Sequence, residues 1–457
     1  MNIKKFTNLP LPDKLIKNLA QLGFENMTEV QQNSLPYILE QKDVIVKAKT
    51  GSGKTVAFSL GVLNNLDNNR YRIQALILCP TRELATQVAT VIKQLVRYLH
   101  NIKVLTLTGG VAYKPQVHSL SHQAHIIVGT PGRVLKHLSE ENFKTEDINT
   151  FVLDEADRML DMGFIEDISQ IISKLPQKRQ NMLFSATFEQ TLEKFTLKLF
   201  NNPIVIQTQT LHASNVITQE FYEVEARYKN DLVLKAFEEN MKSCIIFCNT
   251  KIQCDELADF IEESYDMEVL VLHSDYEQQH REETLILFEN KSYPVLIATD
   301  IAARGLDIDN VDLVLNYEMP QNIENYIHRI GRTARSGNKG KSISFVEDES
   351  YLEELNSETN NSYSFEDITK LQNKNIVTLG YEYSTLYIAG GKKDKLRASD
   401  ILGALIQAVG LSKDDIGKIS ILPKCSYVAI KNSVYQKAYK GLLSNKIKNR
   451  VFKVFKR

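Results

Sequence analysis

The sequence predicts an α/β protein with two doubly wound parallel-sheet domains and a small C-terminal α+β domain. Three observations support this prediction. First, 457 residues are about three times the length of a typical domain. Second, short apolar runs alternate with longer helical patterns twice along the chain, as expected for buried parallel strands joined by helices. Third, the last 73 residues differ from the rest in charge and in strand pattern.

The composition excludes several classes of protein. Hydrophobic residues make up 43% and charged residues 24% of the chain, which is typical of globular proteins and not of collagen or wholly disordered chains. No apolar run approaches the ~20 residues that span a bilayer, and the polar start is unlike a signal peptide. The sequence therefore predicts a cytoplasmic protein with no membrane partner. Five cysteines, an odd number in or beside apolar runs, predict buried reduced thiols.

The first domain is predicted to span residues 1–207. Its strands are expected in five apolar runs, Val44–Val46, Ala75–Leu78, Ile126–Val128, Phe151–Leu153 and Met182–Phe184. A polar stretch at residues 201–218 is predicted to form the hinge to the next domain.

The second domain is predicted to span residues 218–355 and repeats the same rhythm. Its strands are expected at Cys244–Phe247, Val269–Leu272, Val295–Ile297, Val311–Leu315 and Ile343–Phe345. An acidic stretch rich in Ser and Asn, at residues 348–375, is predicted to be a linker.

The third domain, predicted at residues 380–457, shows the pattern of a β-α-β-β-α-β unit. Strands are expected at residues 385–389, 419–422, 427–431 and 451–455, and helices near 399–409 and 433–443. Two helices on one face of an antiparallel sheet would leave the other face free. RNA-recognition folds bind bases on that face.

The C-terminal domain is strongly basic. Residues 385–457 hold 16 Lys and Arg but only four Asp and Glu, a net charge of +12, so the remaining chain carries −13 of the total of −1. A polyanion such as nucleic acid is the natural partner of such a domain. The alternative is a merely soluble basic domain, although solvated charge on a small domain is usually mixed in sign.

A glycine-rich run, Ala48 to Thr55, follows the first predicted strand and precedes a helical pattern. In this context Gly51 and Gly53 would turn backbone N–H groups toward phosphates at a helix N-terminus. Lys54 would reach the β- and γ-phosphates, and the Thr55 hydroxyl would bind Mg²⁺. The sequence therefore predicts a site for ATP and Mg²⁺, with a chance glycine-rich turn as the alternative.

Acidic residues follow another predicted strand, Phe151–Leu153, at the edge where parallel sheets bind ligands. Asp154 is predicted to hold the metal, and Glu155 to orient and deprotonate the attacking water. An isolated acidic run could be a solvated helix cap, but the phosphate loop upstream favours a catalytic role.

The second domain lacks a phosphate loop of its own and ends in an arginine-rich run at residues 326–335. A phosphoryl-transfer site needs positive charge at its transition state, and a second domain can supply it by closing over the nucleotide. Arg332 and Arg335 are therefore predicted to be catalytic. Surface ion pairs would be the alternative for an isolated cluster.

Together these motifs resemble the DEAD-box RNA helicases, which have two RecA-like domains, over residues 1–350. The resemblance implies that Phe6 stacks on adenine, that Gln31 reads adenine, and that Asp307 contacts the ribose of ATP. Three residues are implied to couple hydrolysis to strand separation: Ser185, Thr187 and His328.

The resemblance also implies contacts with the RNA backbone on both domains: Thr81, Arg82, Gly110, Thr130 and Arg133 in the first, and Arg281 and Thr299 in the second. Three positions depart from the usual pattern. Met27 stands where a proline is common, and Ser274 replaces the glycine that usually follows the histidine before it. Ala334 replaces a common glycine between the two predicted catalytic arginines.

The C-terminal domain resembles the RNA-recognition-motif-like (RRM-like) extension of one subfamily of these helicases, which binds a hairpin of large-subunit ribosomal RNA. Tyr387 lies in one of the two strand motifs that stack on bases, whereas Cys425 and Ile430 stand where further rings are usual. Base stacking should therefore be weak. The loop at residues 390–397 is the more promising RNA surface, because glycines allow close approach to a backbone. Four basic residues follow these glycines: Lys392, Lys393, Lys395 and Arg397.

The leading prediction is an ATP-dependent RNA helicase that locally unwinds short RNA duplexes during assembly of the large ribosomal subunit (23S rRNA). Its partner would be a pre-ribosomal particle, and a monomer is assumed. Two rival functions use the same motifs, an RNA clamp that closes with ATP and a DNA helicase. The residues around Gln31 and the basic C-terminal domain favour RNA. A metal- or thiol-based enzyme has no support, because the nine His and five Cys show no ligand spacing.

Overall fold

The computed structural model describes residues 4–48, 51–187, 192, 195–196, 199–200, 202–208, 217–239, 241–265, 267–300, 308, 311–334, 340–359, 361–377 and 379–457. The chain forms two compact units, one ending near residue 212 and one containing most of the remaining residues. The first unit holds a parallel sheet, and the second holds a parallel sheet and a smaller antiparallel sheet. The predicted fold class, two RecA-like domains plus a small C-terminal α+β domain, is confirmed.

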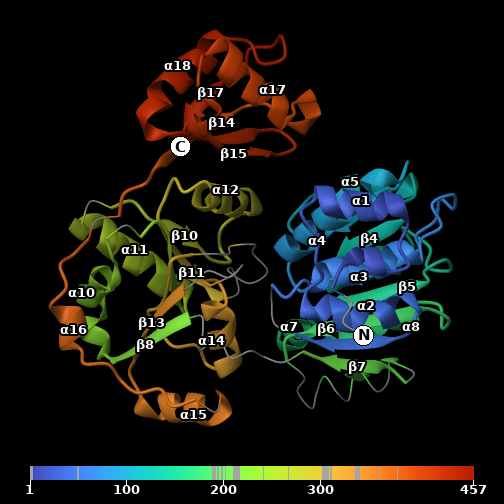
Figure 1. The fold of residues 1–457 in the computed structure, drawn as a ribbon, viewed down its shortest axis with the longest axis horizontal. Coiled ribbons are helices and arrows are strands. Elements are labelled where there is room, and N and C mark those ends of the chain that lie inside the picture. The colour runs from blue at the N-terminus through green and yellow to red at the C-terminus, as the bar shows by residue number, and fades with distance from the viewer. Residues whose placement is uncertain are drawn as a thin grey trace. The chain divides into compact units, whose positions relative to one another are not determined.

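A seven-stranded parallel sheet forms the centre of the first unit, in the order β3-β4-β2-β5-β6-β1-β7. Its strands are β1 (Val44–Lys47), β2 (Ala75–Leu78), β3 (Val104–Leu107), β4 (Ile126–Gly129), β5 (Thr150–Asp154), β6 (Gln180–Ser185) and β7 (Ile204–Gln207). All five predicted runs form strands, and their side chains are almost entirely buried. Burial on both faces follows from the helices that cover the sheet on either side (Figure 1).

Strands β3 and β7 lie at the two edges of this sheet, and the sequence pattern predicts neither. β3 has two half-buried residues, and β7 leaves Val205 64% exposed. Edge strands touch fewer neighbours, so they need no continuous apolar run. The stretch predicted as a hinge, residues 201–218, therefore contains a strand that pairs with β1.

The helical segments of the first unit are η1 (Phe6–Asn8), α1 (Asp13–Gln21), α2 (Glu29–Leu39), α3 (Lys54–Asn64), α4 (Arg82–Leu95), η2 (Val96–Tyr98), α5 (Tyr113–Ser121), α6 (Pro131–Ser139), α7 (Ala156–Asp161) and α8 (Ile165–Ser173). Helices α3, α4, α5, α6 and α7 each follow a strand, whereas α1 and α2 precede β1. Thr28 and Gln31 form a capping box at the start of α2, and the Thr81 hydroxyl caps α4. Pro131 occupies the first turn of α6, where its missing N–H costs nothing. Several predicted functional residues thus also fix helix starts.

The second unit contains a six-stranded parallel sheet in the order β10-β11-β9-β12-β13-β8. Its strands are β8 (Ile217–Glu223), β9 (Cys244–Cys248), β10 (Leu270–Leu272), β11 (Val295–Thr299), β12 (Leu313–Asn316) and β13 (Gly340–Val346). The helical segments of this domain are η4 (Ala226–Tyr228), α10 (Lys229–Val233), η5 (Leu234–Ala236), α11 (Lys251–Tyr265), α12 (Gln278–Glu289), α14 (Ile323–Ile330), α15 (Glu349–Thr359) and α16 (Thr369–Gln372). Five strands match the predicted runs, and edge strand β8 was not predicted because it is half polar.

The stretch predicted as a linker, residues 348–375, is part of the second domain. It contains α15 and α16, whose Leu355 and Leu371 are fully buried. Phe365 forms a bridge to Phe221 on β8, and the Tyr363 ring lies 5.1 Å from that of Phe221. The prediction failed because a few buried side chains anchor a stretch whose surface is acidic.

The C-terminal domain is an antiparallel sheet in the order β15-β16-β14-β17, in the predicted β-α-β-β-α-β arrangement. Its strands are β14 (Tyr383–Ile388), β15 (Ile416–Ile421), β16 (Ser426–Lys431) and β17 (Val454–Lys456). Helix α17 (Ala398–Gly403) continues as a π-helical segment to Ala408, and α18 (Tyr435–Ser444) is the second helix. Short turns lie at η6 (Lys392–Asp394), η8 (Lys413–Asp415) and η9 (Asn432–Val434).

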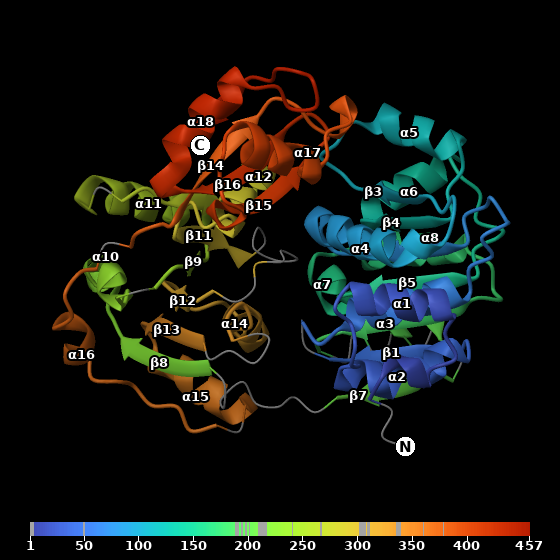
Figure 2. The same cartoon turned by 45° about the horizontal axis from the view of Figure 1, so that its top comes forward.

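The sheet face of the C-terminal domain that was predicted to be free is covered by the second domain. Ile286 of α12 packs against Tyr427 and Cys425. Thr385 of β14 is fully buried, and its hydroxyl meets the Asn290 amide at 2.9 Å and the Ser292 hydroxyl at 2.7 Å. Figures 1 and 2 show α12 beside this sheet from two directions. The prediction of a free face was wrong, because the sheet uses that face to pack on its own chain.

Two smaller expectations concern cysteines and membranes. All five cysteines are free and buried, as predicted. In the part of the chain that the structure describes, no helix combines the length and the apolarity needed to cross a membrane.

Candidate nucleotide and RNA site

Residues 51–53 of the glycine-rich run form the turn that leads into α3. Gly53 is the N-cap of α3 with φ of 92°, in the left-handed region that favours glycine. A Cβ atom at this position would lie 2.5 Å from Nε2 of Gln31, so a larger residue would be strained and would displace the Gln31 amide. The turn therefore presents backbone N–H groups at a helix N-terminus, the arrangement that binds phosphate.

Gln31, predicted to read adenine, and its capping partner Thr28 contact this phosphate loop directly. The Thr28 hydroxyl donates to the Ser52 carbonyl at 2.7 Å, and Gln31 Nε2 donates to the Gly53 carbonyl at 3.0 Å. The Lys54 ammonium donates to the Ala48 carbonyl at 2.7 Å and is 6% exposed. Since a neutral carbonyl is a weaker partner for an ammonium group than a phosphate, a nucleotide can take over this contact.

Phe6 lies in the hydrophobic core of the first domain, 2% exposed. A backbone hydrogen bond of 2.8 Å from Met27 to Lys4 ties its segment to the start of α2. The segment is therefore held beside the residues that precede α2, and stacking of Phe6 on adenine stays a prediction.

Three carboxylates gather at the end of β5. Asp154 is 3% exposed, and burial raises its pKa to about 7, with Lys54 opposing the rise and Glu155 and Asp157 adding to it. Such a crowded, buried carboxylate favours a nearby cation. Asp154 and the half-buried Thr55 hydroxyl are oxygen donors of the kind Mg²⁺ prefers, so the residues present fit this ion.

Glu155, the predicted catalytic base, is held by an arginine that the sequence analysis missed. Its backbone is left-handed, with φ of 53° and ψ of 54°, and its carboxylate accepts from Arg158 Nη1 at 2.7 Å. Both side chains are buried. Nε and Nη2 of Arg158 have no hydrogen-bond partner among the described residues. The spacing of three residues on a helix was the signal that could have identified this pair.

Asp157 links the acidic run to the end of β6. Its Oδ2 accepts from the backbone N–H groups of Ala186 and Thr187 at 2.8 and 2.9 Å, and from the Thr187 hydroxyl at 3.2 Å. The Asp157 N–H donates to the Ser185 hydroxyl at 3.3 Å. Ser185 and Thr187, predicted to couple hydrolysis to strand separation, thus contact Asp157 of the acidic run directly.

The predicted RNA contacts of the first domain lie at the same edge of the sheet. The Arg82 guanidinium packs so closely on Gly110 that a Cβ atom there would lie 1.6 Å from Nη1. Thr130 is the N-cap of α6, one turn before Arg133. Arg133 Nη1 donates to the Val111 carbonyl at 3.2 Å. Loops after β2, β3 and β4 therefore bring these residues together with Thr81.

The second domain has a hollow of about 350 Å³ at the carboxyl ends of its strands. It is lined by Asn249, Lys251, Ser274, Thr299, Asp300, Gln321 and Asn325. Thr299, a predicted RNA contact, is one of these residues. The wall is polar and includes Lys251, which is ion-paired with the exposed Asp275 at 2.6 Å. A phosphate of a sugar-phosphate backbone could replace this exposed partner.

Arg329, which was not among the predicted residues, hydrogen-bonds two residues that line this hollow, Asn249 and Asp300. It is 2% exposed and grips both carboxylate oxygens of Asp300, Nε to Oδ1 at 2.7 Å and Nη2 to Oδ2 at 2.8 Å. Nη2 also donates to Asn249 Oδ1 at 2.9 Å, and Nη1 donates to the Glu318 carbonyl at 2.5 Å. Its position three residues after the buried Tyr326, on the buried face of α14, was the available signal.

The other predicted residues of the second domain are placed as follows. Arg332 follows α14 and is 4% exposed. His328 is half-buried within α14, and Arg281 lies in the first turn of α12. Asp307 and Arg335 lie outside the described residues.

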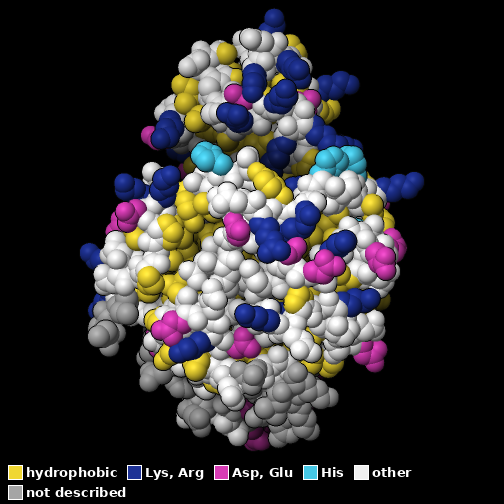
Figure 3. All heavy atoms as spheres, turned by 90° about the vertical axis from the view of Figure 1, so that its right-hand side faces the viewer, with side chains coloured by type: hydrophobic (Ala, Val, Ile, Leu, Met, Phe, Trp, Pro, Cys, Tyr) yellow, Lys and Arg dark blue, Asp and Glu magenta, His cyan; other side chains and the backbone are white. Residues whose placement is uncertain are grey.

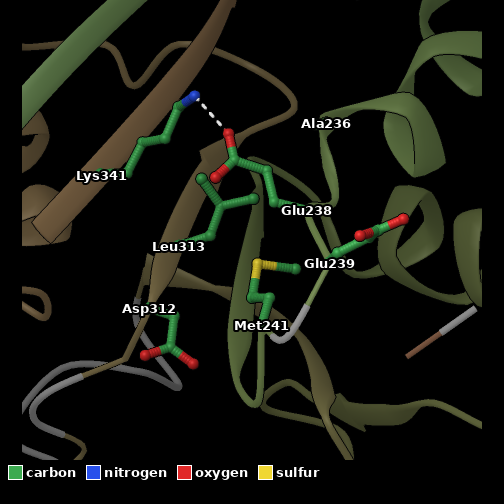
Figure 4. Close-up of a pocket in the computed structure, with 7 residues that line it drawn as sticks. All are labelled: Ala236, Glu238, Glu239, Met241, Asp312, Leu313 and Lys341. Carbon is green, nitrogen blue, oxygen red and sulfur yellow. Dashed lines mark hydrogen bonds and ion pairs between the residues drawn. The ribbon is translucent and has the colours of Figure 1, made fainter. Parts of the chain in front are cut away.

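A second, smaller hollow of about 220 Å³ lies at the opposite edge of the same sheet (Figure 4). Lys341 bridges Glu238 and Glu220 at 2.7 Å each. Asp312 accepts from the backbone N–H groups of Lys242 and Ser243. These charged groups stabilise one another and lie away from the strand ends that carry the predicted site.

The basic loop of the C-terminal domain has a rigid backbone. A Cβ atom at Gly391 would lie 2.3 Å from the Leu422 carbonyl. The N–H groups of Lys392 and Lys393 donate to the carbonyls of Leu422 and Pro423 at 2.9 and 3.0 Å. The side chains of all four predicted residues, Lys392, Lys393, Lys395 and Arg397, are exposed. Figure 3 shows Lys and Arg side chains gathered on this domain, at the top of the view.

Tyr387 lies on the covered sheet face. Its ring centroid is 5.3 Å from that of Tyr427 and 5.8 Å from that of Phe455, and the Arg457 guanidinium lies 5.3 Å away. It packs on the cluster that contains Ile286. The predicted role of Tyr387 as a ring on a free base-binding face is therefore corrected, because the second domain occupies that face.

The fold and the site together define a class of protein. One RecA-like domain carries a phosphate loop and a carboxylate cluster, and a second repeats the fold with a polar hollow at the same edge. A basic module is attached to the second. These are the parts of a nucleotide-driven motor that acts on nucleic acid.

Comparisons with known proteins agree with this class. The DEAD/DEAH box helicase model matches residues 28–195, the helicase conserved C-terminal domain matches residues 228–337, and the DbpA RNA binding domain matches residues 385–455. The ATP-dependent RNA helicase DbpA of Escherichia coli is 44% identical over 97% of both chains. Its namesake from Bacillus subtilis is 38% identical over 99% of both.

Solved structures show the same likeness over the two RecA-like domains. S. cerevisiae Dbp5 bound to RNA and ADP BeF3 has a TM-score of 0.72 at 30% identity, covering 79% of this chain and 95% of that one. Mss116p bound to ssRNA and AMP-PNP has a TM-score of 0.69 at 29% identity, covering 79% of each chain. This chain belongs to the DEAD-box ATP-dependent RNA helicases of the DbpA type, an ATP-hydrolysing, RNA-binding family.

Proposed function

We propose that this helicase acts on 23S rRNA during assembly of the large ribosomal subunit, where it opens short duplexes near a hairpin bound by its C-terminal domain. One observation carries the proposal. A domain with a net charge of +12 presents a rigid basic loop and packs directly on the second helicase domain. RNA held by that loop is therefore held at a fixed distance from the hollow around Thr299.

The hydrolytic site would work through groups already in place. Lys54 would leave the Ala48 carbonyl for the β- and γ-phosphates, and Thr55 and Asp154 would hold Mg²⁺. The ion supplies positive charge to the phosphate oxygens. Glu155, positioned by Arg158, would orient the attacking water and accept its proton.

Completion of the site would require the second domain. Arg332 and Arg335 would add positive charge as the transition state forms, and Asp307 would contact the ribose. Asp157 would transmit the state of the nucleotide to Ser185 and Thr187, since it is hydrogen-bonded to both. His328 would complete this coupling from the second domain.

The protein would bind RNA mainly through the sugar-phosphate backbone. Arg82 and Arg133 on the first domain, and Arg281 and Thr299 on the second, would contact phosphates and sugars. Because the sheet face of the C-terminal domain is covered, the hairpin would be recognised by the loop at residues 390–397. Lys392 and Arg397 are among the exposed groups that this loop offers.

The proposed reaction is local. A base-pair step is worth ~1.4 kcal/mol on the DNA scale, so opening about four steps costs roughly 6 kcal/mol, which one binding event can supply. Opening about twenty steps at once would cost nearly 30 kcal/mol, more than any single binding difference provides. The helicase would thus melt short duplexes of a pre-ribosomal particle, and we take it to act as a monomer. Because the similar helicases named above are bacterial, we propose that this protein would bind its RNA substrate in the cytoplasm.

The test compares the RNA-stimulated ATPase rate on 23S rRNA fragments with and without the hairpin. The intact chain should reach half-maximal rate at a much lower concentration of the hairpin RNA. Replacing Lys392, Lys393, Lys395 and Arg397 together with alanine should remove this preference and leave stimulation by unstructured RNA. The matched control replaces Lys413, Lys437, Lys440 and Lys446 on the same domain, which changes the charge equally. Equal loss in both variants, or no preference in the intact chain, would contradict the proposal.

A further inference from the structure

Gln116 is a buried hydrogen-bonding centre on the predicted RNA edge of the first domain. It lies on α5 and is 8% exposed. Its Nε2 donates to the Thr108 carbonyl at 3.0 Å, which identifies the other end of the amide as the acceptor. That Oε1 accepts from Arg133 Nη1 at 3.0 Å and from His137 Nε2 at 2.9 Å. Gln116 therefore joins the strand end before Gly109 to both the first and the last turn of α6.

His137 is fixed in one neutral tautomer. Because Gln116 Oε1 is an acceptor, Nε2 of His137 must carry the proton, and Nδ1 is then free to accept from the Asn142 amide at 3.3 Å. Burial, and after it the charge of Arg133, lowers the pKa of His137 to about 4. The His137 ring also stacks on Tyr113, with centroids 4.3 Å apart and an angle of 17°. Near neutral pH this histidine is a rigid donor.

Arg133 is held on one side and open on the other. Within the part of the chain that the structure describes, Arg133 donates to Gln116 and to the Val111 carbonyl, and both hydrogen bonds use Nη1. The guanidinium carbon lies 5.4 Å from the centroid of the Tyr113 ring. The side chain is half-exposed, so the Nε and Nη2 edge, which suits two phosphate oxygens, is the edge not used by these contacts.

We propose that Gln116 and His137 are positioning residues that hold Arg133 ready for an RNA phosphate before RNA arrives. Freezing a long arginine side chain beforehand lowers the entropy lost on binding. The same bonds join the turn at Gly109 and Gly110 to α6, so two of the RNA-contacting segments move as one surface. This inference rests on the proposed contact between Arg133 and RNA.

The test measures binding of a labelled oligouridylate, which lacks the hairpin, to the full-length protein with a non-hydrolysable ATP analogue at several salt concentrations. Gln116→Leu should weaken RNA binding roughly tenfold. It should also reduce the slope of log affinity against log salt by ~0.7, the value for one lost phosphate contact on a single strand. Nucleotide affinity without RNA should not change.

Two sets of controls separate positioning from folding. Gln74→Leu removes another buried glutamine, which is 2% exposed and makes three hydrogen bonds to Asp67 and Arg70. Gln74 precedes β2, whereas the predicted RNA contacts Thr81 and Arg82 follow that strand. Gln74→Leu should leave the salt slope unchanged. His137→Gln keeps an N–H donor and should retain RNA affinity, whereas His137→Phe keeps the ring on Tyr113 and should lose it.

A double-variant cycle assigns the effect. Arg133→Ala and Gln116→Leu should weaken RNA binding together no more than Arg133→Ala does alone, because both remove the same contact. Additive losses, or a Gln116→Leu protein with the slope of the parent, would overturn the positioning role. So would an equal loss of RNA-free nucleotide affinity. If Arg133→Ala itself had no effect on RNA binding, the proposed RNA contact would fail instead.

Discussion

Each of the two parallel-sheet domains places charged groups at the carboxyl ends of its strands, but the two domains differ in how completely these groups are hydrogen-bonded. In the first, Asp154 and Glu155 share a buried site with Lys54 and Arg158, and two guanidinium nitrogens of Arg158 have no hydrogen-bond partner among the described residues. In the second, Arg329 is surrounded by acceptors from three segments of the chain. An incompletely satisfied cluster is built to take a ligand, whereas a saturated one holds a surface in shape.

The comparison predicts where chemistry is lost and where stability is lost. Glu155→Gln keeps the size of the side chain and removes the base. ATP should still bind, and hydrolysis should fall by ~10²–10⁴, the usual contribution of a general base. Glu166→Gln, an acid in the first turn of α8, is the control and should be neutral. Turnover near that of the parent would remove Glu155 from the mechanism.

Arg329→Met should instead destabilise the second domain. It leaves the Asp300 carboxylate without its buried partner, and breaking such a pair costs about 3–5 kcal/mol of unfolding free energy. Arg227→Met, on an arginine whose ion pair is exposed, should cost under about 1 kcal/mol. Denaturant unfolding of both variants measures the difference. Similar small losses would show that the saturated network is not a scaffold.

The first domain should be less stable at higher pH without nucleotide and Mg²⁺. The pKa of Asp154 is about 7 in the folded state against an ordinary 3.8, so the folded protein binds the extra proton between these values. Stability contributed by this group is then lost as pH rises from about 4 to 7, by a few kcal/mol at most. Asp154→Asn should flatten this dependence and be the more stable protein at pH 8. An unchanged pH profile in the variant would contradict the raised pKa.

The contact between the C-terminal domain and α12 should give a smaller effect. Thr385→Val keeps the shape but removes the partner of the Asn290 and Ser292 side chains, at a cost of about 1–3 kcal/mol for buried groups left unsatisfied. Lys418→Ala removes only a surface ion pair with Glu289 and should cost under about 1 kcal/mol. Amide hydrogen exchange of α12 reports both. Equal protection in the two variants would mean that the buried hydroxyl does not hold the domains together.

Local patterns predicted much of this molecule because each lies within one stretch of chain. The central strands are continuous apolar runs, and Lys54 and Asp154 each follow such a run, so sheet geometry alone places them at one edge. The edge strands β3, β7 and β8 were missed because partial exposure interrupts their apolar pattern.

The missed features depend on partners distant in the sequence. Arg329 is defined by Asn249 and Asp300, which only the folded sheet brings to it. The covered face of the C-terminal domain depends on Ile286 of α12, whose partners Cys425 and Tyr427 lie in another domain. The apolar periodicity of a segment does not indicate which distant residues it will contact. For this reason the sequence predicted a free sheet face in the C-terminal domain and a linker at residues 348–375.

Strand displacement by the full-length protein tests the proposed local melting most directly. The substrate is hairpin-bearing RNA with an adjoining duplex of about four or about twenty base pairs. One ATP-driven closure should open the short duplex and leave the long one intact, with similar ATPase rates on both. Efficient, processive unwinding of the long duplex would contradict local melting. ATP hydrolysis with neither duplex opened would show instead that the protein is an RNA clamp that closes with ATP.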